Sequence, residues 1–287
     1  MSKIVVTGSL HYDIMLQAHH RPEKGETVMG TDCAYKFGGK GGNQALSAAR
    51  AGAEVSFIGA VGDDDQGKFL LSQLNHAGVD TQRVAVLDSV PSGMSVAILD
   101  AENDYGAVVV SNANNAIDPA QFTVVSAWQN SVMLLLQNEV PESVNVCAAA
   151  QAKLRGVTVC LNAAPAREIS AEMRAAVDLL VVNAVEARDL SGLKVADLAS
   201  ACLAAESLSR QFPAVVVTAG EYGVAWCEQG QSCQSLAAEK VVLVSTHGAG
   251  DCFMGVLAAA LLRQHSLAEA VTLANQAAAE HVSRQPI

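Results

Sequence analysis

The sequence predicts an α/β fold, in which a doubly wound, largely parallel sheet has helices on both of its faces. Two observations lead to this prediction. Apolar runs of strand length alternate along the chain with segments of helical periodicity, and a glycine directly follows several of these helical segments. In addition, 287 residues with a hydrophobic content of 51% supply enough apolar material for one large core. Right-handed crossovers are expected between successive parallel strands.

Six short apolar runs are expected to be the buried strands of this sheet, because strands covered on both faces are apolar throughout. They are Ile4–Thr7, Val55–Val61, Val132–Leu136, Val157–Leu161, Leu179–Val182 and Val215–Thr218. Four helices are expected among them, at Asn43–Ala51, Gln66–Ala77, Glu142–Leu154 and Val195–Gln211. Farther along the chain, a strand-like run, Val241–Val244, leads towards a helix-like run, Cys252–Arg263.

Two segments, residues 13–36 and 91–110, interrupt this alternation. They combine polar turns with short alternating runs such as Met94 to Ile98, which is typical of extra β-strands outside the main sheet. We expect them to form a small β lid at the ligand edge of the core, because such insertions commonly exclude water from a reaction. Ordinary surface hairpins are the alternative. The core would comprise residues 1–12, 37–90 and 111–287.

The net charge restricts the partners of the protein. With 18 bases and 29 acids the chain carries a formal charge of -11, which disfavours nucleic acid and anionic membranes as partners. No apolar run approaches the roughly 18 residues of a membrane span, and the N-terminus has no secretory signal. The seven cysteines are odd in number and lack the Cys-x-x-Cys spacing of a zinc site. We therefore expect a cytoplasmic protein.

The segment Thr246–Asp251 places two glycines and one acid between an expected strand and an expected helix. At a helix N-terminus several backbone N–H groups lack intrahelical partners, so the amides around Gly248, Ala249 and Gly250 can hold a phosphate. A carboxylate would be repelled there unless it accepted a proton from a hydroxyl that attacks phosphorus. The segment thus predicts phosphoryl transfer with Asp251 as the base. Alternatively, Asp251 is only an acid favoured by the helix macrodipole.

A second glycine cluster, Phe37–Asn43, precedes an expected helix. Its backbone can approach a small ligand closely, while Lys40 and Asn43 offer hydrogen-bond donors. The cluster is not a Walker A loop, because Gly41 follows Lys40, and it is not the dinucleotide pattern Gly-x-Gly-x-x-Gly with a suitably placed acid. A purely structural turn is the alternative.

Asn183 and Glu186 stand at the end of the expected strand Leu179–Val182. If a helix begins at Asn183, the two residues have the spacing of a capping box, with Asn183 as N-cap and Glu186 at the third helical position. The functional alternative is that both residues face phosphates. Glu186 would then hold a Mg²⁺ ion through water, since hard cations prefer oxygen ligands and keep part of their hydration shell.

Together these motifs resemble the ribokinase family, the PfkB-type carbohydrate kinases, from about Ile4 to Ser283. Both signature regions of that family have counterparts here, a Gly-Gly-Lys-Gly-x-Asn stretch that ends at Asn43 and a Gly-Ala-Gly-Asp stretch that ends at Asp251. The resemblance is strongest to ribokinases, through Gly8-Ser9-x-x-x-Asp13, Asn162-x-Ala164-Pro165-Ala166 and Asn183-x-x-Glu186.

The resemblance implies an ATP-dependent kinase that phosphorylates a primary hydroxyl of ribose or a similar small sugar, with a β lid that often forms a homodimer contact. Asp251 matches the catalytic base, and Gly248, Ala249 and Gly250 match its anion hole. Sugar-binding positions are matched by Asp13, Gly39, Lys40, Asn43 and Glu139, with His11 beside them. Nucleotide-binding positions are matched by Asn183, Thr218 and Gly220, with Gly223 from the same segment, and Glu186 matches a metal-associated glutamate.

Two residues depart from the ribokinase pattern. His11 stands where ribokinases usually carry an asparagine beside the sugar, which leaves open the hydroxyl pattern that the pocket recognises. Ser245 stands where they usually have an aspartate that helps to bind a monovalent cation, which puts activation by K⁺ in doubt. Two other functions stay open: a nucleoside kinase on the same scaffold, and a non-catalytic protein that senses sugars or nucleosides.

Overall fold

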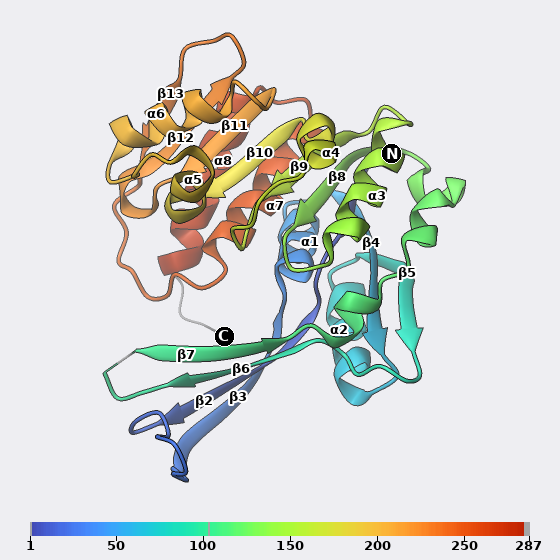
Figure 1. Cartoon of the computed structure of the whole chain (residues 1–287), viewed down its shortest axis with the longest axis vertical. Helices are drawn as coiled ribbons and strands as arrows, with labels where there is room; N and C mark the ends of the chain where they lie inside the picture. Colours follow the sequence, from blue (N-terminus) through green and yellow to red (C-terminus); the bar gives the residue numbers. More distant parts are fainter. Residues whose placement is uncertain (1, 103, 284–287) are drawn as a thin grey trace.

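The larger of two sheets in the computed structural model has nine strands, with helices on both faces (Figure 1). The structure describes residues 2–102 and 104–283. Residues 1, 103 and 284–287, which the expected core and lid include, lie outside the described residues. In the order of the sheet the strands are β13 (Gln234–Ala237), β12 (Gly223–Glu228), β11 (Ala214–Thr218), β10 (Leu179–Asn183), β9 (Thr158–Asn162), β8 (Ser131–Gln137), β1 (Lys3–Thr7), β4 (Glu54–Gly62) and β5 (Asp80–Leu87).

This sheet confirms the predicted α/β class. All six predicted strands are present, as β1, β4, β8, β9, β10 and β11. Neighbouring strands from β5 to β11 in the sheet order pair in parallel. At the other edge β12 pairs antiparallel with both β11 and β13. Parallel strands end at the same edge of a sheet, so residues that follow different strands meet there.

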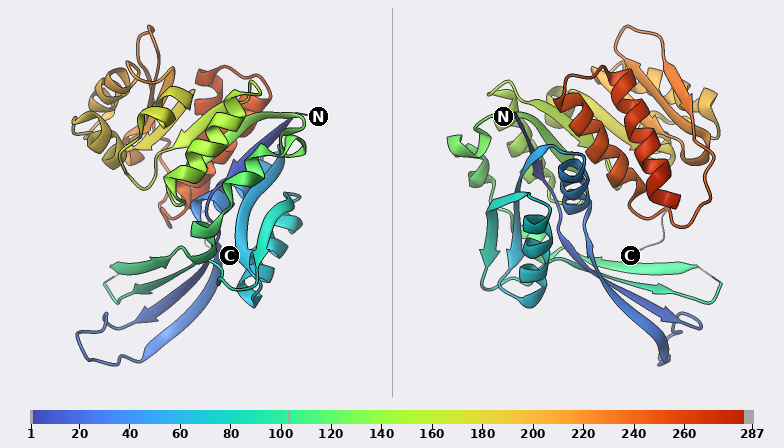
Figure 2. Two further views of the ribbon diagram at one scale, coloured as in Figure 1. Left: turned by 45° about the vertical axis from the view of Figure 1, so that its right-hand side comes forward. Right: turned by 180° about the vertical axis from the view of Figure 1, so that it is seen from behind.

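Helices cover the two faces of the sheet in separate groups. On one face lie α1 (Lys40–Arg50), α2 (Asp65–His76), α7 (Ala249–Leu262) and α8 (Leu267–Ser283). On the other face lie α3 (Glu142–Lys153), α4 (Ala171–Ala176), α5 (Ala184–Ser191) and α6 (Leu198–Leu208). Figure 2 shows α7 and α8 side by side when the molecule is seen from behind. No helix within the described residues has the length and apolar character needed to cross a bilayer.

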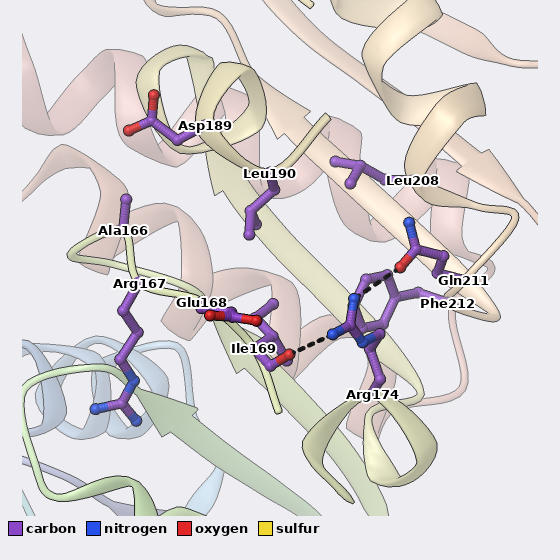
Figure 3. Close-up of a pocket in the computed structure, with 10 residues that line it drawn as sticks. All are labelled: Ala166, Arg167, Glu168, Ile169, Arg174, Asp189, Leu190, Leu208, Gln211 and Phe212. Atoms are coloured by element: carbon purple, nitrogen blue, oxygen red, sulfur yellow. Dashed lines mark hydrogen bonds between the residues drawn. The ribbon is translucent and has the colours of Figure 1, made fainter. Parts of the chain in front are cut away.

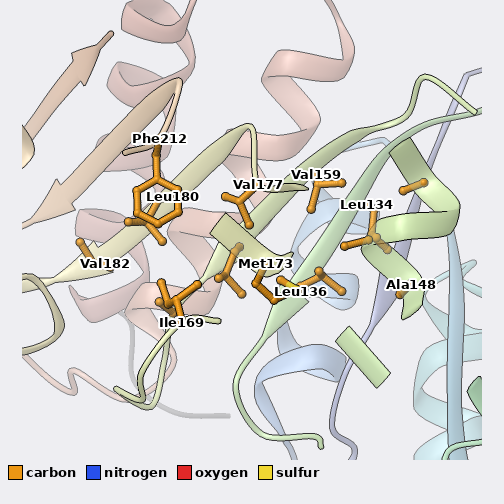
Figure 4. Close-up of a cluster of buried hydrophobic side chains, with 14 of the residues drawn as sticks. Leu134, Leu136, Ala148, Val159, Ile169, Met173, Val177, Leu180, Val182 and Phe212 are labelled. Atoms are coloured by element: carbon orange, nitrogen blue, oxygen red, sulfur yellow. The ribbon is translucent and has the colours of Figure 1, made fainter. Parts of the chain in front are cut away.

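The core has two halves because successive side chains of a strand point to opposite faces. Ile4 and Val6 of β1 pack with α1, α7 and α8, whereas Val5 packs with the opposite group of helices. Figure 4 shows part of that second half, where Leu134 and Leu136 of β8 lie near α3 and α4. These side chains are fully buried, so the sheet is a rigid platform for the residues at its edge.

A close helix contact brings α7 onto α1. A Cβ added at Gly255 of α7 would lie 2.4 Å from the Cβ of Ser47 in α1, so only glycine permits this approach. The hydroxyl of Ser47 also donates a 3.0 Å hydrogen bond to the carbonyl of Cys252. The contact sets the first turn of α7 beside the first turns of α1.

The smaller sheet has four strands in the order β3-β2-β6-β7 and projects from the main body (Figure 2). Its strands are β2 (His11–Ala18), β3 (Gly30–Gly38), β6 (Met94–Leu99) and β7 (Tyr105–Val110). They come from the two regions that the sequence analysis assigned to a lid, and we call this sheet the lid sheet. β2 pairs antiparallel with β3 and parallel with β6.

One predicted element is wrong, and two helices, α1 and α7, begin three residues earlier than predicted, with α7 beginning at Ala249 and not at Cys252. Val241–Val244 is an exposed loop, in which Val242 is 82% exposed. The backbone amides of Val244 and Ser245 donate to the carbonyl of Val282 at the end of α8. This segment therefore lies against the end of a helix instead of extending the sheet. α1 begins at Lys40 and not at Asn43, which places both residues in its first turn.

Short helices complete the chain. Three 3₁₀ helices connect β7 to β8, at Asn112–Ala116, Pro119–Thr123 and Val125–Trp128, and a fourth, Gly220–Tyr222, follows β11. None of them was predicted from the sequence.

Candidate active site

The N-terminus of α7 presents free backbone amides. Gly248 is the N-cap residue in the left-handed conformation, with φ of 74°, which favours glycine. The amide of Ala249 donates to the carbonyl of Thr246 at 3.3 Å and that of Cys252 to the carbonyl of Gly248 at 2.8 Å, whereas the amides of Gly250 and Asp251 have no backbone acceptor among the described residues. A Cβ added at Gly250 would meet no atom within 4 Å, so the space beside these amides is open. This end of α7 can therefore hold an anion.

Asp251 is a buried carboxylate in the first turn of α7, with 8% of its surface exposed. Gln44 Nε2 donates to its Oδ1 at 3.0 Å, and Asn43 Nδ2 approaches its Oδ2 at 3.4 Å. Burial raises the pKa of this carboxyl, while the charge of Lys40 and the hydrogen bond from Gln44 oppose the rise. A carboxylate with a raised pKa and one weakly bound oxygen can accept a proton.

The glycine cluster before α1 lets this helix begin against the turn that follows β1. Gly39 has φ of 87°, and a Cβ added there would lie 2.7 Å from the carbonyl oxygen of Ser9. Glu139, which follows β8, accepts hydrogen bonds from the backbone amide of Lys40 at 2.8 Å and from the hydroxyl of Ser9. The structural interpretation of the glycines therefore holds at Gly39, and the same turn carries Lys40 and Asn43 to the site.

Asp13 lies at the base of the lid sheet. Its Oδ1 accepts a hydrogen bond from Ser95 Oγ at 2.6 Å, and its side chain fills the space that a Cβ of Gly38 would need. Burial raises the pKa of Asp13, whereas the hydrogen bond from Ser95 and the imidazoles of His11 and His247 lower it. Asp13 can thus accept hydrogen bonds from the hydroxyls of a small ligand.

His11 begins β2 and is 4% exposed, and its Nε2 has no hydrogen-bond partner among the described residues. It lines a hollow of about 350 Å³ together with Glu139. The other lining residues are Val109, Ser111, Asn115, Asn138, Val140, Pro141 and Pro165. A buried ring nitrogen without a partner beside such a hollow is able to form a hydrogen bond with a polar group of a ligand.

The predicted capping box of α5 is confirmed. Asn183 accepts hydrogen bonds from the amides of Val185 and Glu186, and Glu186 accepts at both oxygens from Asn183, at 2.8 Å from the backbone N and 2.9 Å from Nδ2. Burial raises the pKa of Glu186, against the hydrogen bond from Asn183 and the charge of Lys40. The charge of Lys40 therefore acts on both Glu186 and Asp251.

Three further predicted residues lie at the end of the sheet beside α5. Thr218 ends β11, and its hydroxyl approaches the carbonyl of Val182 at 3.4 Å. Gly220 has φ of 57° and open space where a Cβ would stand. Gly223 has φ of 118°, and an added Cβ would lie 2.1 Å from the carbonyl oxygen of Leu236, so this glycine is required by the pairing of β12 with β13.

The described residues contain no group of three or more His, Cys, Asp or Glu side chains placed to hold a metal ion. Both oxygens of Glu186 already accept from Asn183, so it fits a metal only through water, and the ion's other ligands would be phosphate oxygens. Ser245, at the position in doubt for K⁺, accepts from the amide of His247 at 3.2 Å and offers no charge to a cation.

Comparison with known proteins decides the family. A model described as pfkB family carbohydrate kinase matches residues 1–285. The chain belongs to the pfkB family of carbohydrate kinases. It is 34% identical over 284 residues to ribokinase of Haemophilus influenzae, covering 98% of this chain and 92% of that relative. It is 32% identical over 290 residues to ribokinase of Lactococcus lactis, covering 99% and 91%.

Solved structures agree with this pfkB-family assignment. Arabidopsis thaliana ribokinase complexed with ribose and ATP has a TM-score of 0.92 at 28% identity, covering 100% of this chain and 94% of that one. A nucleoside kinase from Methanocaldococcus jannaschii, with a TM-score of 0.82 at 16% identity, shares the fold. This pfkB-family chain is thus a phosphotransferase with an alcohol group as acceptor.

Sequence analysis missed part of the polar site of this pfkB kinase. Gln44, Gln137 and Asn162 are buried and connect to Asp251 through side-chain hydrogen bonds. Two of these residues could have been found from the sequence, because Gln44 directly follows Asn43 and Asn162 belongs to the ribokinase-like pattern. For Gln137 the only signal was its position at the end of an expected strand. His247, which acts on Asp13 from the α7 side, was also missed.

A second hollow in the pfkB kinase, also about 350 Å³, lies among α4, α5 and α6 (Figure 3). Arg174 closes one side, where it donates to Gln211 at 3.1 Å and to the carbonyl of Ile169 at 2.8 Å. None of the residues predicted for catalysis or binding lines this second hollow.

Proposed function

We propose that this chain transfers the γ-phosphoryl group of ATP to a primary hydroxyl of ribose or a similar small sugar, with Asp251 as the catalytic base. The observation that carries the proposal is the position of Asp251, a buried carboxylate with a raised pKa beside the free amides of α7. The ribokinase names of the relatives and the ribose and ATP in the Arabidopsis complex support the choice of substrate.

In this mechanism the sugar lies over the start of α1. Its hydroxyls bind to the side chains of Asp13, Lys40, Asn43 and Glu139 and to the backbone of Gly39. The primary hydroxyl faces Oδ2 of Asp251. As the hydroxyl oxygen bonds to the γ-phosphorus, the bond from phosphorus to the β–γ bridging oxygen breaks and ADP leaves. The hydroxyl proton passes to Asp251, a step that contributes roughly 10²- to 10⁴-fold in rate.

The negative charge on the transferred phosphoryl group is stabilised at the N-terminus of α7. The amides around Gly248, Ala249 and Gly250 stabilise the equatorial oxygens, and Lys40 adds a positive charge that acts on both Asp251 and Glu186. Asn183, Thr218, Gly220 and Gly223 hold the nucleotide. A Mg²⁺ ion that Glu186 orients through water would supply further neutralisation of the phosphates.

The lid sheet supports two further parts of the proposal. It would cover the sugar and exclude water, which otherwise competes for the phosphoryl group. Its edge strands expose apolar side chains, with Val108 of β7 at 68% and Tyr35 of β3 at 60%, which favours a homodimer formed through the lid. We also place the enzyme in the cytoplasm, because no disulfide joins the cysteines within the described residues, which suits a reducing compartment.

The test is a coupled ADP-release assay with wild type and Asp251→Asn on a panel of pentoses, hexoses and nucleosides. We expect turnover with ribose or a similar sugar, and at least about 10²-fold less turnover in Asp251→Asn at unchanged ligand affinity. Faster turnover with nucleosides would assign the nucleoside-kinase alternative. Thermal stabilisation by sugars without any ADP release would assign the sensing protein. Near-normal turnover in Asp251→Asn would remove Asp251 from the role of base.

A further inference from the structure

Four buried side chains form a continuous chain of hydrogen bonds that ends at Asp251. Gln137 Nε2 donates to Gln44 Oε1 at 2.8 Å, and Gln44 Nε2 donates both to Asp251 Oδ1 at 3.0 Å and to Asn162 Oδ1 at 3.0 Å. Gln44 and Gln137 are fully buried, and Asn162 is 9% exposed. The two amide protons and the carbonyl oxygen of Gln44 are therefore all used.

A backbone carbonyl fixes the direction of this chain. Asn162 Nδ2 donates to the carbonyl oxygen of Val181 at 3.2 Å, and a carbonyl oxygen can only accept. The side-chain oxygen of Asn162 must then point towards Gln44, and Gln44 must donate to it from its NH₂ group. The oxygen of Gln44 consequently faces Gln137, which has to donate. The orientation of three amides follows from one peptide group of β10.

The fixed orientation of these amides has one energetic cost and one consequence for Asp251. The cost is that Gln137 Oε1 is buried without a hydrogen-bond partner among the described residues, because the amide of Gln137 is turned to serve Gln44. The consequence is that Asp251 receives a donor at Oδ1. A neutral carboxylic acid gains less from such a donor than a carboxylate does, so the hydrogen bond favours the ionised form.

The second oxygen of Asp251 is differently placed. Among the described residues, Oδ2 accepts one side-chain hydrogen bond, a long one of 3.4 Å from Asn43 Nδ2. Oδ1 is thus held by a directed donor while Oδ2 keeps lone pairs for an incoming proton. The other charged groups that act on Asp251 are Lys40, which favours the carboxylate, and Glu139, which disfavours it.

We infer that Gln44 is a positioning residue for the base: it holds Oδ1 of Asp251 and leaves Oδ2 as the oxygen that takes the proton of the acceptor hydroxyl. Asn162 and Gln137 act one step farther away, by fixing which face of the Gln44 amide meets the carboxylate. The inference rests on the proposed role of Asp251, and it assigns a function to residues that do not touch the sugar in this mechanism.

The test compares Gln44→Leu, Gln44→Glu and Gln137→Leu with wild type. For each enzyme we would measure the single-turnover rate of ADP formation with saturating sugar and ATP from pH 5 to 9, together with the melting temperature. Asn145→Leu is the matched control. Asn145 is fully buried and donates to the backbone carbonyl of Gln137 at 2.8 Å, but within the described residues it forms no hydrogen bond with Asp251 or Gln44.

Gln44→Leu is expected to lower the rate at pH 7 by at least about 10-fold and to move the acid limb of the profile upwards by roughly one pH unit, because Asp251 loses its donor. Gln44→Glu is expected to move the limb farther, since a second carboxylate then faces Asp251. Gln137→Leu, which acts only through the Gln44 amide, is expected to shift the limb in the same direction by less. Asn145→Leu is expected to lower the melting temperature and to keep the wild-type profile.

An unchanged acid limb in Gln44→Leu and Gln137→Leu would overturn the inference, even if both variants were less stable. If Gln44→Leu does not fold, Gln44→Glu and Gln137→Leu decide by the same criterion. Asp251→Asn separates this failure from failure of the proposed function. An inactive Asp251→Asn with an unshifted Gln44→Leu rejects only the role of Gln44, whereas an active Asp251→Asn rejects the base itself.

Discussion

Asp13 and Ser95 join two lid strands through a 2.6 Å hydrogen bond from the serine hydroxyl to the aspartate carboxylate. The two residues are also register partners in the parallel pairing of β2 with β6. The lid sheet therefore orients the carboxylate that we expect to bind the sugar, and we expect a change in the lid to alter substrate binding.

Ser95→Ala is expected to raise the KM for the sugar about 10-fold with little change in kcat. Asp13 would lose one charge-assisted hydrogen bond that holds its rotamer, and such bonds contribute about 1.5–3 kcal/mol. Steady-state kinetics at saturating ATP measures the effect. Thr31→Ala is the control, because Thr31 donates to the carbonyl of Gln17 elsewhere in the lid sheet. Equal KM values for Ser95→Ala and wild type would contradict the role of Asp13 in sugar binding.

The rate of the chemical step is expected to fall at acid pH through protonation of Asp251. Burial raises the pKa of this carboxyl above 3.8, and a base is active only when it has lost its proton. The acid limb of kcat should consequently lie at a higher pH than the titration of an ordinary aspartate. A profile of kcat against pH with both substrates saturating measures it. A kcat that stays constant down to the range where free aspartates titrate would contradict this expectation.

Asp251→Asn is expected to raise the melting temperature at pH 7. Because folding raises the pKa of Asp251, the ionised carboxylate opposes folding at every pH above both the folded and the unfolded pKa, and asparagine removes that cost. Asp65→Asn is a matched control, since Asp65 lies in the first turn of α2 with its side chain 95% exposed. Asparagine there should lose a few tenths of a kcal/mol of macrodipole interaction. If both variants lose the same stability, Asp251 is an ordinary acid of a helix start.

Glu186→Gln is expected to increase the Mg²⁺ concentration needed for half-maximal rate. Glutamine keeps one acceptor oxygen for the capping box of α5 and loses the other, which would lower the free energy of unfolding by about 1 kcal/mol. Ser200→Ala is the control, because Ser200 completes the capping box of α6 with Asp197. An Mg²⁺ titration of activity distinguishes the two effects. If both variants lose stability and neither changes its Mg²⁺ requirement, Glu186 serves only the helix.

Val108→Asp is expected to shift the protein towards monomers. Val108 stands on the edge strand β7 and is 68% exposed, so a charge there would disrupt association through the lid with little effect on folding. Sedimentation equilibrium measures the change. Leu203→Asp on α6, where the leucine is 58% exposed, is the control and should leave the association unchanged. A monomeric wild type would contradict the proposed homodimer.

Local sequence patterns predicted most of the fold. Apolar runs such as Val55–Val61 became strands because their side chains are buried whichever face they point to. The capping box at Asn183 was predictable because it depends on two residues three positions apart. The run Val241–Val244 has the same apolar composition but lies beyond β13, where it bonds to the end of α8 and is exposed.

The sequence by itself determined the family, the α/β class and the positions of Asp251, Lys40 and Glu186 as candidates, because each of these rests on local spacing. Only the tertiary structure decided how they meet. Gln44 and Asp251 are 207 residues apart, and their hydrogen bond exists because α7 packs closely on α1. The direction of the amides behind that bond depends on a carbonyl in a third element, β10, and no local pattern specifies a contact among separate elements.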